Sequence, residues 1–290
     1  MSHAMSLLTG WDLAPVPLAA LVLVAVLYVA AARRVTRLVP AQPWPALETG
    51  CFLGGILTTA VAILGPPGAF DDVFFYAHMT QHILLTMVAA PLFVLGDPVL
   101  LVLRVSSHEF RRRRLVPVYR SRALGFLVHP GVGWLLFVGV MVLSHIPAVY
   151  DFALTRPRVH DYVEHPLYLV TAAVFFYPLL GPTTGPRHLP EGLRVLSLFS
   201  VMLPMAMLGF FVYAASHVDY PFYAHVVRPF GPGPLADQHL SGALMWASSM
   251  ALSVGWMVLA GLRWLQSEER KSRRGDVAAA RVAPPAPESA

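Results

Sequence analysis

The sequence contains few charged residues, a single cysteine and a single lysine. Aspartate, glutamate, lysine and arginine together make up 13% of the 290 residues, whereas 56% are hydrophobic. An ordinary soluble domain carries about 25% charged residues, so this composition excludes that class and indicates an integral membrane protein.

The lone cysteine, Cys51, excludes an internal disulfide and a metal motif built on paired thiolates. A metal site in this chain must therefore use histidine, methionine and carboxylate ligands, a set that suits copper, zinc or iron. The lone lysine, Lys271, lies in the C-terminal tail. No lysine within a hydrophobic run can form the Schiff base of a retinal protein, although a seven-span receptor of another kind stays open.

Hydrophobic runs of membrane-spanning length recur along the whole chain. A helix needs about 20 residues to cross a hydrocarbon core about 30 Å thick. Runs of this kind lie at about residues 15–33, 46–64, 73–95, 124–146, 162–181, 193–215 and 239–264. Their length favours helices over the short alternating strands of a barrel. We therefore predict an all-α polytopic membrane bundle of about seven transmembrane helices.

Two segments are expected to depart from this pattern. Pro91 and Gly96-Asp97-Pro98 interrupt the third run, so residues 99–104 are predicted to form an interfacial segment. Residues 267–290 are charged and then rich in alanine and proline, a composition that cannot bury a core. The prediction is a bundle over 1–266 and a disordered tail over 267–290.

The distribution of basic residues predicts the orientation, because arginines and lysines near span ends stay on the cytoplasmic side. One side of the predicted bundle carries Arg33, Arg34, Arg37, Arg104, Arg111 to Arg114, Arg120, Arg122, Arg187, Arg194, Arg263 and the basic tail. The other side carries only Arg156, Arg158 and Arg228. The N-terminus is therefore expected outside and the C-terminus in the cytoplasm. The basic residues are expected to attract anionic lipid headgroups and not nucleic acid.

Histidines gather on the predicted outer side. Eight fall there: His78, His82, His145, His160, His165, His217, His225 and His239. The outer loops also carry six aspartates: Asp71, Asp72, Asp151, Asp161, Asp219 and Asp237. A single histidine is usually a hydrogen-bonded structural residue, but this convergence predicts a metal site.

The first pair of candidate ligands is His78 and His82, which opens the third run. Their i, i+4 spacing stacks both imidazoles on one helical face. The alternative is a polar helix mouth whose histidines bond to water or to a neighbouring helix. The cost of ionisable groups within a membrane favours the functional interpretation.

The segment from His160 to His165 opens the fifth run and contains two i, i+4 pairs, His160 with Glu164 and Asp161 with His165. A carboxylate beside a metal-bound imidazole fixes its tautomer, and Asp237 beside His239 is a third candidate for this role. Helix capping would explain the acids but not both histidines. A single site requires the third and fifth runs to touch.

Other span ends supply weaker candidates. His145, His217 and His239 could complete the metal site. Three methionines of the sixth run, Met202, Met205 and Met207, could be soft ligands for Cu(I) or ordinary packing residues.

Four ordered motifs together carry a family resemblance: the segment His78–His82, the segment Pro91–Pro98, Glu164-His165 with Gly181-Pro182, and Asp237-Gln238-His239 with Gly242 and Met245-Trp246. The chain resembles the multi-spanning CtaG-type cytochrome c oxidase assembly proteins from about Trp44 to Leu262. The resemblance implies a multi-pass protein of the bacterial plasma membrane. It also implies an accessory factor, not an enzyme, that contacts haem–copper oxidase subunits and handles Cu(I) at the outer face. Matching positions make His78, His82, His160 and His165 the implied ligands.

Several other functions stay open on the sequence alone. A haem-binding membrane cytochrome also uses histidines from facing helices. A metalloenzyme could use Glu164 as a base beside a metal-activated water. A membrane scaffold would need no metal. A transporter is less favoured, because the sequence has no evident internal repeat or paired broken helices.

Overall fold

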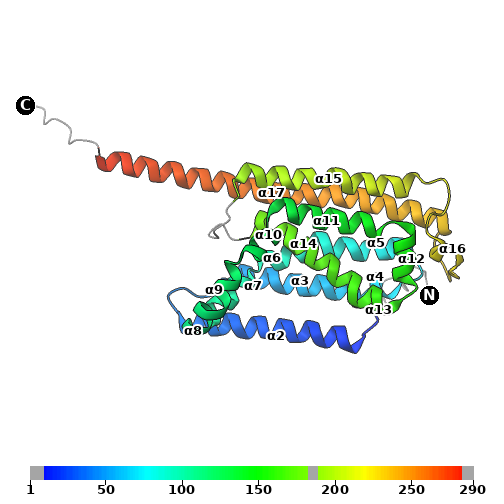
Figure 1. Cartoon of the computed structure of the whole chain (residues 1–290), viewed down its shortest axis with the longest axis horizontal. Helices are drawn as coiled ribbons and strands as arrows, with labels where there is room; N and C mark the ends of the chain where they lie inside the picture. Colours follow the sequence, from blue (N-terminus) through cyan, green and yellow to red (C-terminus); the bar gives the residue numbers. More distant parts are fainter. Residues whose placement is uncertain (1–9, 182–188, 283–290) are drawn as a thin grey trace, which may run out of the picture.

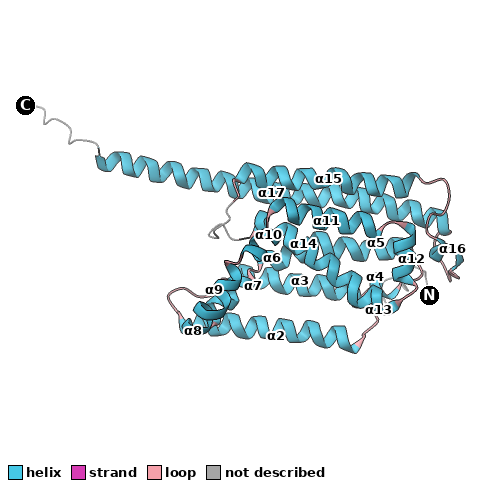
Figure 2. Ribbon diagram, viewed as in Figure 1, coloured by secondary structure: helices cyan, strands magenta, loops and turns pink. Residues whose placement is uncertain are grey.

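In the computed structural model, which describes residues 10–181 and 189–282, all regular secondary structure of the described part is helical (Figure 2). Pro182, Arg187 and His188 fall outside these residues. Long helices run side by side as an elongated bundle, with short helices gathered at its two ends (Figure 1).

Among the described residues, six helical segments are long and apolar enough to cross a membrane. They are α2 (Pro15–Leu38), α3 with α4 (Ala46–Leu64 and Pro66–Ala69), the segment Phe75–Val105 that begins with α5 (Phe75–Ile83), the segment Pro157–Leu180 that contains α13 (Pro157–Val159) and α14 (His165–Leu180), α15 (Glu191–Ala214) and the first part of α17 (Pro234–Val282). The bent pair of α11 (Pro130–Ser144) and α12 (Pro147–Leu154), with an angle of 79°, is the seventh candidate. The prediction of an all-α bundle with about seven spans is confirmed at this level.

Three short π-helical turns each lie just before a proline. They are η1 (Leu84–Ala89) before Pro91, η2 (Arg111–Leu115) before Pro117, and η3 (His160–Glu164) before Pro166. Proline lacks an N–H and clashes with the carbonyl four residues earlier, so the backbone widens there. The carbonyl of Met87, left free by Pro91, instead accepts a hydrogen bond from Trp256 Nε1 at 2.9 Å.

The predicted break in the third run is present at Asp97. Its backbone is left-handed, with φ of 45°, and its carboxylate accepts a hydrogen bond from Leu100 N at 3.2 Å. The helix that follows, α7 (Pro98–Val105), packs against α2 and buries Leu101. Residues 99–104 thus belong to a short helix that follows the break at Gly96-Asp97. The whole segment Phe75–Val105 counts as one candidate span, so the interfacial placement of residues 99–104 stays a prediction.

Helices α15 and α17 pack closely against each other through two glycines. A Cβ on Gly242 would lie 2.3 Å from Tyr213 N, and a Cβ on Gly209 would lie 2.7 Å from Trp246 N. Small residues let membrane helices approach until their backbones touch. The main core lies among α5, α11, α14, α15 and α17, while α2 lies at the edge of the bundle (Figure 1).

The two ends of the bundle carry different short elements. The helices α12, α13 and α16 (Pro221–His225) lie at one end, which we call the histidine end. At the other end lie α8 (His108–Phe110), η2, α9 (Val116–Tyr119) and α10 (Arg122–Leu127), and we call it the arginine end (Figure 1).

The C-terminal segment differs from the expectation of a disordered tail from residue 267. Helix α17 continues without a break to Val282, and residues 283–290 lie outside the described part of the chain. Residues 267–282 are rich in arginine, glutamate and alanine, which are strong helix formers, so the helical backbone of the last span continues. The division of the chain at residue 266 stays a prediction.

Candidate metal centre

Five imidazoles are buried together at the histidine end: His78, His82, His145, His160 and His165. The ring centroids lie 4.0 Å apart for His78 and His82, 5.0 Å for His78 and His160, and 4.4 Å for His160 and His165. His145, at the bend between α11 and α12, lies 5.9 Å from His82. The third and fifth spans are therefore in contact, as a single site requires.

The rings of His78 and His82 are open for a ligand. Both nitrogens of each ring, and Nδ1 of His165, are buried and have no hydrogen-bond partner among the described residues. An unsatisfied buried polar atom costs about 1–3 kcal/mol, so native proteins rarely leave five such atoms together. Each neutral ring offers one lone pair, so one nitrogen of each of the three rings fits a bound metal ion.

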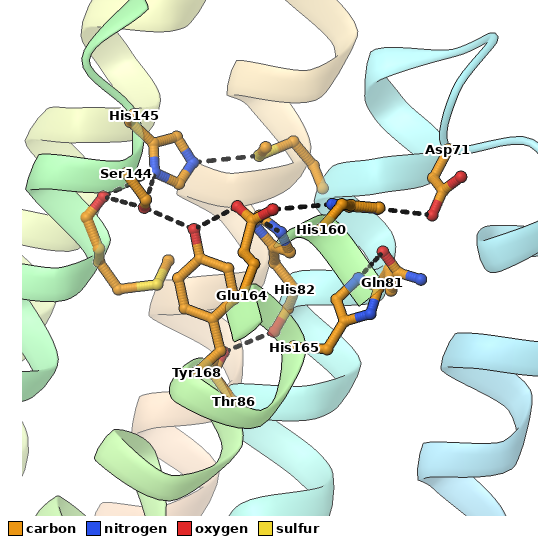
Figure 3. A network of polar contacts seen from close by, with 12 residues as sticks. Asp71, Gln81, His82, Thr86, Ser144, His145, His160, Glu164, His165 and Tyr168 are labelled. Atoms are coloured by element: carbon orange, nitrogen blue, oxygen red, sulfur yellow. Dashed lines mark hydrogen bonds and ion pairs between the residues drawn. The ribbon is translucent and has the colours of Figure 1, made fainter. Parts of the chain in front are cut away.

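His160 is held between two carboxylates. Its Nδ1 lies 2.7 Å from Glu164 Oε2, and its Nε2 lies 3.1 Å from Asp71 Oδ2 (Figure 3). The other oxygen of Glu164 accepts a hydrogen bond from Tyr168 OH at 3.2 Å and lies 3.8 Å from His82 Nε2. The predicted pairing of His160 with Glu164 is present.

Within the described part of the chain, two overlapping triplets of side chains could hold a metal ion. Asp71, His160 and His165 form one, and His78, His160 and Glu164 form the other, with ligand atoms within 4.8 Å of one another. Sequence reasoning placed Asp71 in an outer loop but did not select it. The missing signal is tertiary: Tyr223 OH on α16 donates to the Asp71 carbonyl at 2.5 Å and holds this loop over the histidines. Burial raises the pKa of that Tyr223 hydroxyl well above its usual value.

A hydrogen-bond chain sets the tautomer of His165. Gln81 Nε2 donates to Ala62 O at 3.2 Å, which turns the amide oxygen Oε1 toward His165 Nε2 at 2.9 Å (Figure 3). Because Oε1 can only accept, His165 carries its proton on Nε2 and presents the lone pair of Nδ1. Gln81 is thus an orienting residue that sequence reasoning missed.

The predicted partner of His165, Asp161, does not play this role. Asp161 is exposed, and the structure gives His165 to Gln81 instead. The reason is the π turn η3, in which His165 N bonds to His160 O five residues earlier. This wider turn changes the spacing on which the i, i+4 prediction rests.

Asp237 acts on a helix and not on a histidine. Its fully buried carboxylate accepts hydrogen bonds from Phe75 N at 2.9 Å and Tyr76 N at 3.0 Å, and lies 3.4 Å from Arg228 Nη2. It therefore caps the N-terminus of α5, the helix that carries His78 and His82. Asp237 therefore positions the helix that carries two candidate ligands. Among the described residues it does not hydrogen-bond to a histidine side chain, although the prediction had expected this.

The structure leaves His217 and His239 outside the cluster. His217 is 78% exposed and pairs with Asp219 at 3.0 Å. His239 donates from Nε2 to Ala215 O at 2.8 Å and links α17 to the end of α15. Both histidines therefore make ordinary structural contacts, as single histidines usually do.

A cavity of about 710 Å³ leads from the surface to the cluster. Its lining includes Asp12, Asp71 and Asp72 as well as His160 and His165. Burial, and then the neighbouring Asp71, raise the pKa of Asp72. A passage lined by acids attracts cations, and Asp12 is exposed at its rim.

These features define a polytopic helical membrane protein whose buried histidine and carboxylate groups have the chemistry of a metal centre. The chain belongs to the cytochrome c oxidase caa3 assembly factor family (Caa3_CtaG), which matches residues 26–267. The resemblance found in the sequence motifs is thereby confirmed.

Mycobacterial proteins are among the curated relatives. An uncharacterized protein of Mycobacterium leprae is 28% identical over 257 residues, which cover 86% of this chain and 38% of the relative. Uncharacterized proteins of Mycobacterium bovis and Mycobacterium tuberculosis are each 29% identical over 241 residues, or 80% of this chain and 36% of the relative. This chain thus spans less than two fifths of the length of these relatives. No solved structure gives a significant match.

Proposed function

We propose that this protein helps to mature a haem–copper cytochrome c oxidase by binding Cu(I) at the histidine end and delivering it to an oxidase subunit. The observation that carries the proposal is the set of five buried, unpartnered imidazole nitrogens on His78, His82 and His165. Cu(I) accepts imidazole and thioether ligands, and the chain has no thiolate pair to compete.

Each residue has a stated role. His78, His82 and His165 bind the ion through free lone pairs, while Gln81 fixes the tautomer of His165. His160 already bonds to two carboxylates, so the ion must displace one of those contacts to engage it. Glu164 and Asp71 then balance the positive charge of the ion. Carboxylates commonly lie beside metal-bound histidines in this way.

We place the histidine end outside the bacterial plasma membrane and the arginine end in the cytoplasm. Arg111 to Arg114 lie in η2 at the arginine end, and the positive-inside rule orients such clusters. The protein then acts as an accessory factor and not as an enzyme, and copper reaches the cluster through the acidic cavity beside α2.

A haem at this cluster is less well supported. The ring of Tyr150 packs 4.9 Å from His78, and the ring of Tyr168 packs 4.2 Å from His82. Aromatic rings packed directly on the imidazoles favour a small ion over a flat macrocycle.

The test is Cu(I) titration of detergent-purified protein against a competing chelator. We expect the His78→Ala/His82→Ala variant to lose copper, and the matched His217→Ala/His239→Ala variant to retain it. An absorption spectrum of the same samples reports haem through its Soret band. If the wild-type protein takes up no Cu(I), the copper role is wrong and a scaffold without metal remains.

A further inference from the structure

A second group of soft ligands lies directly beside the histidines. A cavity of about 10 Å³, roughly the size of one water or one ion, lies among the helices of the bundle. Ten residues line it: Met79, His82, Ile83, Thr86, Met87, Phe137, Met141, Met205, Met245 and Ser249. Methionine supplies five of these ten residues but only 11 of the 290 in the chain.

The five thioethers come from four different spans. Met79 and Met87 belong to the third span, and Met141, Met205 and Met245 belong to α11, α15 and α17. All five are at most 5% exposed. At about 1.5 Å of rise per residue, Met205 and Met245 lie roughly 14 and 17 Å along their helices from the histidine end. The cavity therefore lies inside the bundle, on the inner side of the histidine cluster.

Two histidines connect this cavity to the metal centre. His82 lines the cavity, and both of its nitrogens lack a partner among the described residues. His145 lies next to it, with Nδ1 at 2.6 Å from Met141 O and Nε2 at 3.5 Å from Met79 Sδ. A carbonyl only accepts, so Nδ1 carries the proton and Nε2 turns a lone pair toward the sulfur. Two lone-pair donors facing each other fit a soft cation between them.

Ordinary packing is the competing explanation, since methionine fills irregular gaps in cores. Packing, however, predicts a filled space and not an ion-sized void lined by thioethers. It also does not explain why the unpartnered imidazole of His82 lies at the same void. Neutral thioethers bind Cu(I) and discriminate against Mg²⁺, which prefers oxygen ligands.

We infer that this methionine-lined cavity is a second Cu(I) site, which receives the ion from the histidine cluster. The inference rests on the proposed copper function. Transfer is ligand exchange: Cu–N bonds to the histidine cluster break as Cu–S bonds to Met205 and Met245 form. The ion stays Cu(I), so no electron is gained or lost.

The test compares two double variants with the same chemistry on the same two helices. Met205→Leu/Met245→Leu removes two thioethers from the cavity at nearly constant volume. Met207→Leu/Met250→Leu removes two exposed ones, on α15 and α17, and is the matched control. Cu(I) uptake is measured against a chelator, and X-ray absorption of the bound copper reports whether sulfur is among its ligands.

We expect sulfur ligands in the wild-type protein and in the control. The cavity variant should bind about one copper equivalent fewer and lose the sulfur signal, while copper on the histidines persists. Copper bound only through nitrogen and oxygen in the wild-type protein overturns the methionine site but leaves the proposed function intact. That spectrum needs no variant, so it decides the matter even if the cavity variant does not fold. Absence of Cu(I) uptake by the wild-type protein contradicts the proposed function itself.

Discussion

The histidine cluster at one end of the bundle, and helices α8 and η2 with His129 at the other, hold the same kinds of residue in opposite environments. In the histidine cluster, His160 and Glu164 are buried and in contact, and the half-buried Asp71 also contacts His160. At the arginine end, His108 and His129 are exposed, and Arg113 pairs with Glu109 while both side chains stay more than 70% exposed. Burial, and not residue type, distinguishes a candidate functional site from a solvated surface. Burying an ionisable group costs free energy, so a cluster of such groups indicates a function.

The largest expected difference between the ends concerns buried and exposed acids. Asp237→Ala removes two hydrogen bonds from the N-terminus of α5 and leaves Arg228 without its carboxylate. We expect the free energy of unfolding in detergent to fall by about 3–5 kcal/mol, as when one partner of a buried pair is lost. Glu109→Ala at the arginine end should leave it nearly unchanged. If both substitutions lower the free energy of unfolding equally, burial does not distinguish these two acids.

Histidine substitutions should separate the ends by copper affinity. His165→Ala deletes a ligand, so we expect Cu(I) affinity to fall by more than the roughly 100-fold that loss of an orienting partner costs. His129→Ala, whose Nδ1 only accepts a hydrogen bond from Gly131 N, should not change it. Chelator competition on both variants measures the difference. A loss of affinity in the His129 variant would mean that copper binds outside the cluster.

Gln81 provides a finer test, because it orients a ligand without binding the ion. Gln81→Ala frees the tautomer of His165, and we expect Cu(I) affinity to fall by about 10–100-fold. Gln81→Glu keeps an acceptor for His165 Nε2 and should recover part of this loss. Gln42→Ala, at the arginine end, is the control and should have no effect. If the Ala and Glu variants bind copper alike, the tautomer argument is wrong.

The smallest effect is expected for the ion pair of Arg113 with Glu109. An exposed pair of this kind contributes about 0–1 kcal/mol, and high salt screens it. Thermal unfolding of Arg113→Ala in detergent should therefore match the wild-type protein within about 0.5 kcal/mol. A larger loss would show that the arginine end packs more tightly than its exposure indicates.

The predicted site and the observed cluster agree where the argument depended on local helix geometry. His78 and His82 share a face of α5, and His160 reaches Glu164 four residues later. The same reasoning did not hold for Asp161, since it assumed a regular α-helix where Pro166 imposes a π turn. It missed Asp71 and Gln81, whose partners lie 89 and 84 residues away in the chain.

The sequence also could not show which methionine of the sixth run faces its neighbouring helices. The sequence offered Met202, Met205 and Met207 as equal candidates within one apolar run, but only Met205 lines the cavity. A helix that is apolar all round has no periodic signal to show which side faces its neighbours.

The amino-acid sequence by itself indicated an all-helical bundle with about seven candidate spans, and it placed the clustered histidines at one end of that bundle. Those features follow from the thickness of the hydrocarbon core, the rise of a helix and the cost of burying charge. Only the tertiary structure decided which side chains meet: Asp237 on the end of α5, Gln81 on His165, and the thioethers of four spans around one cavity. The rotation of each helix about its axis depends on packing against all the others, and no single run of residues contains that information.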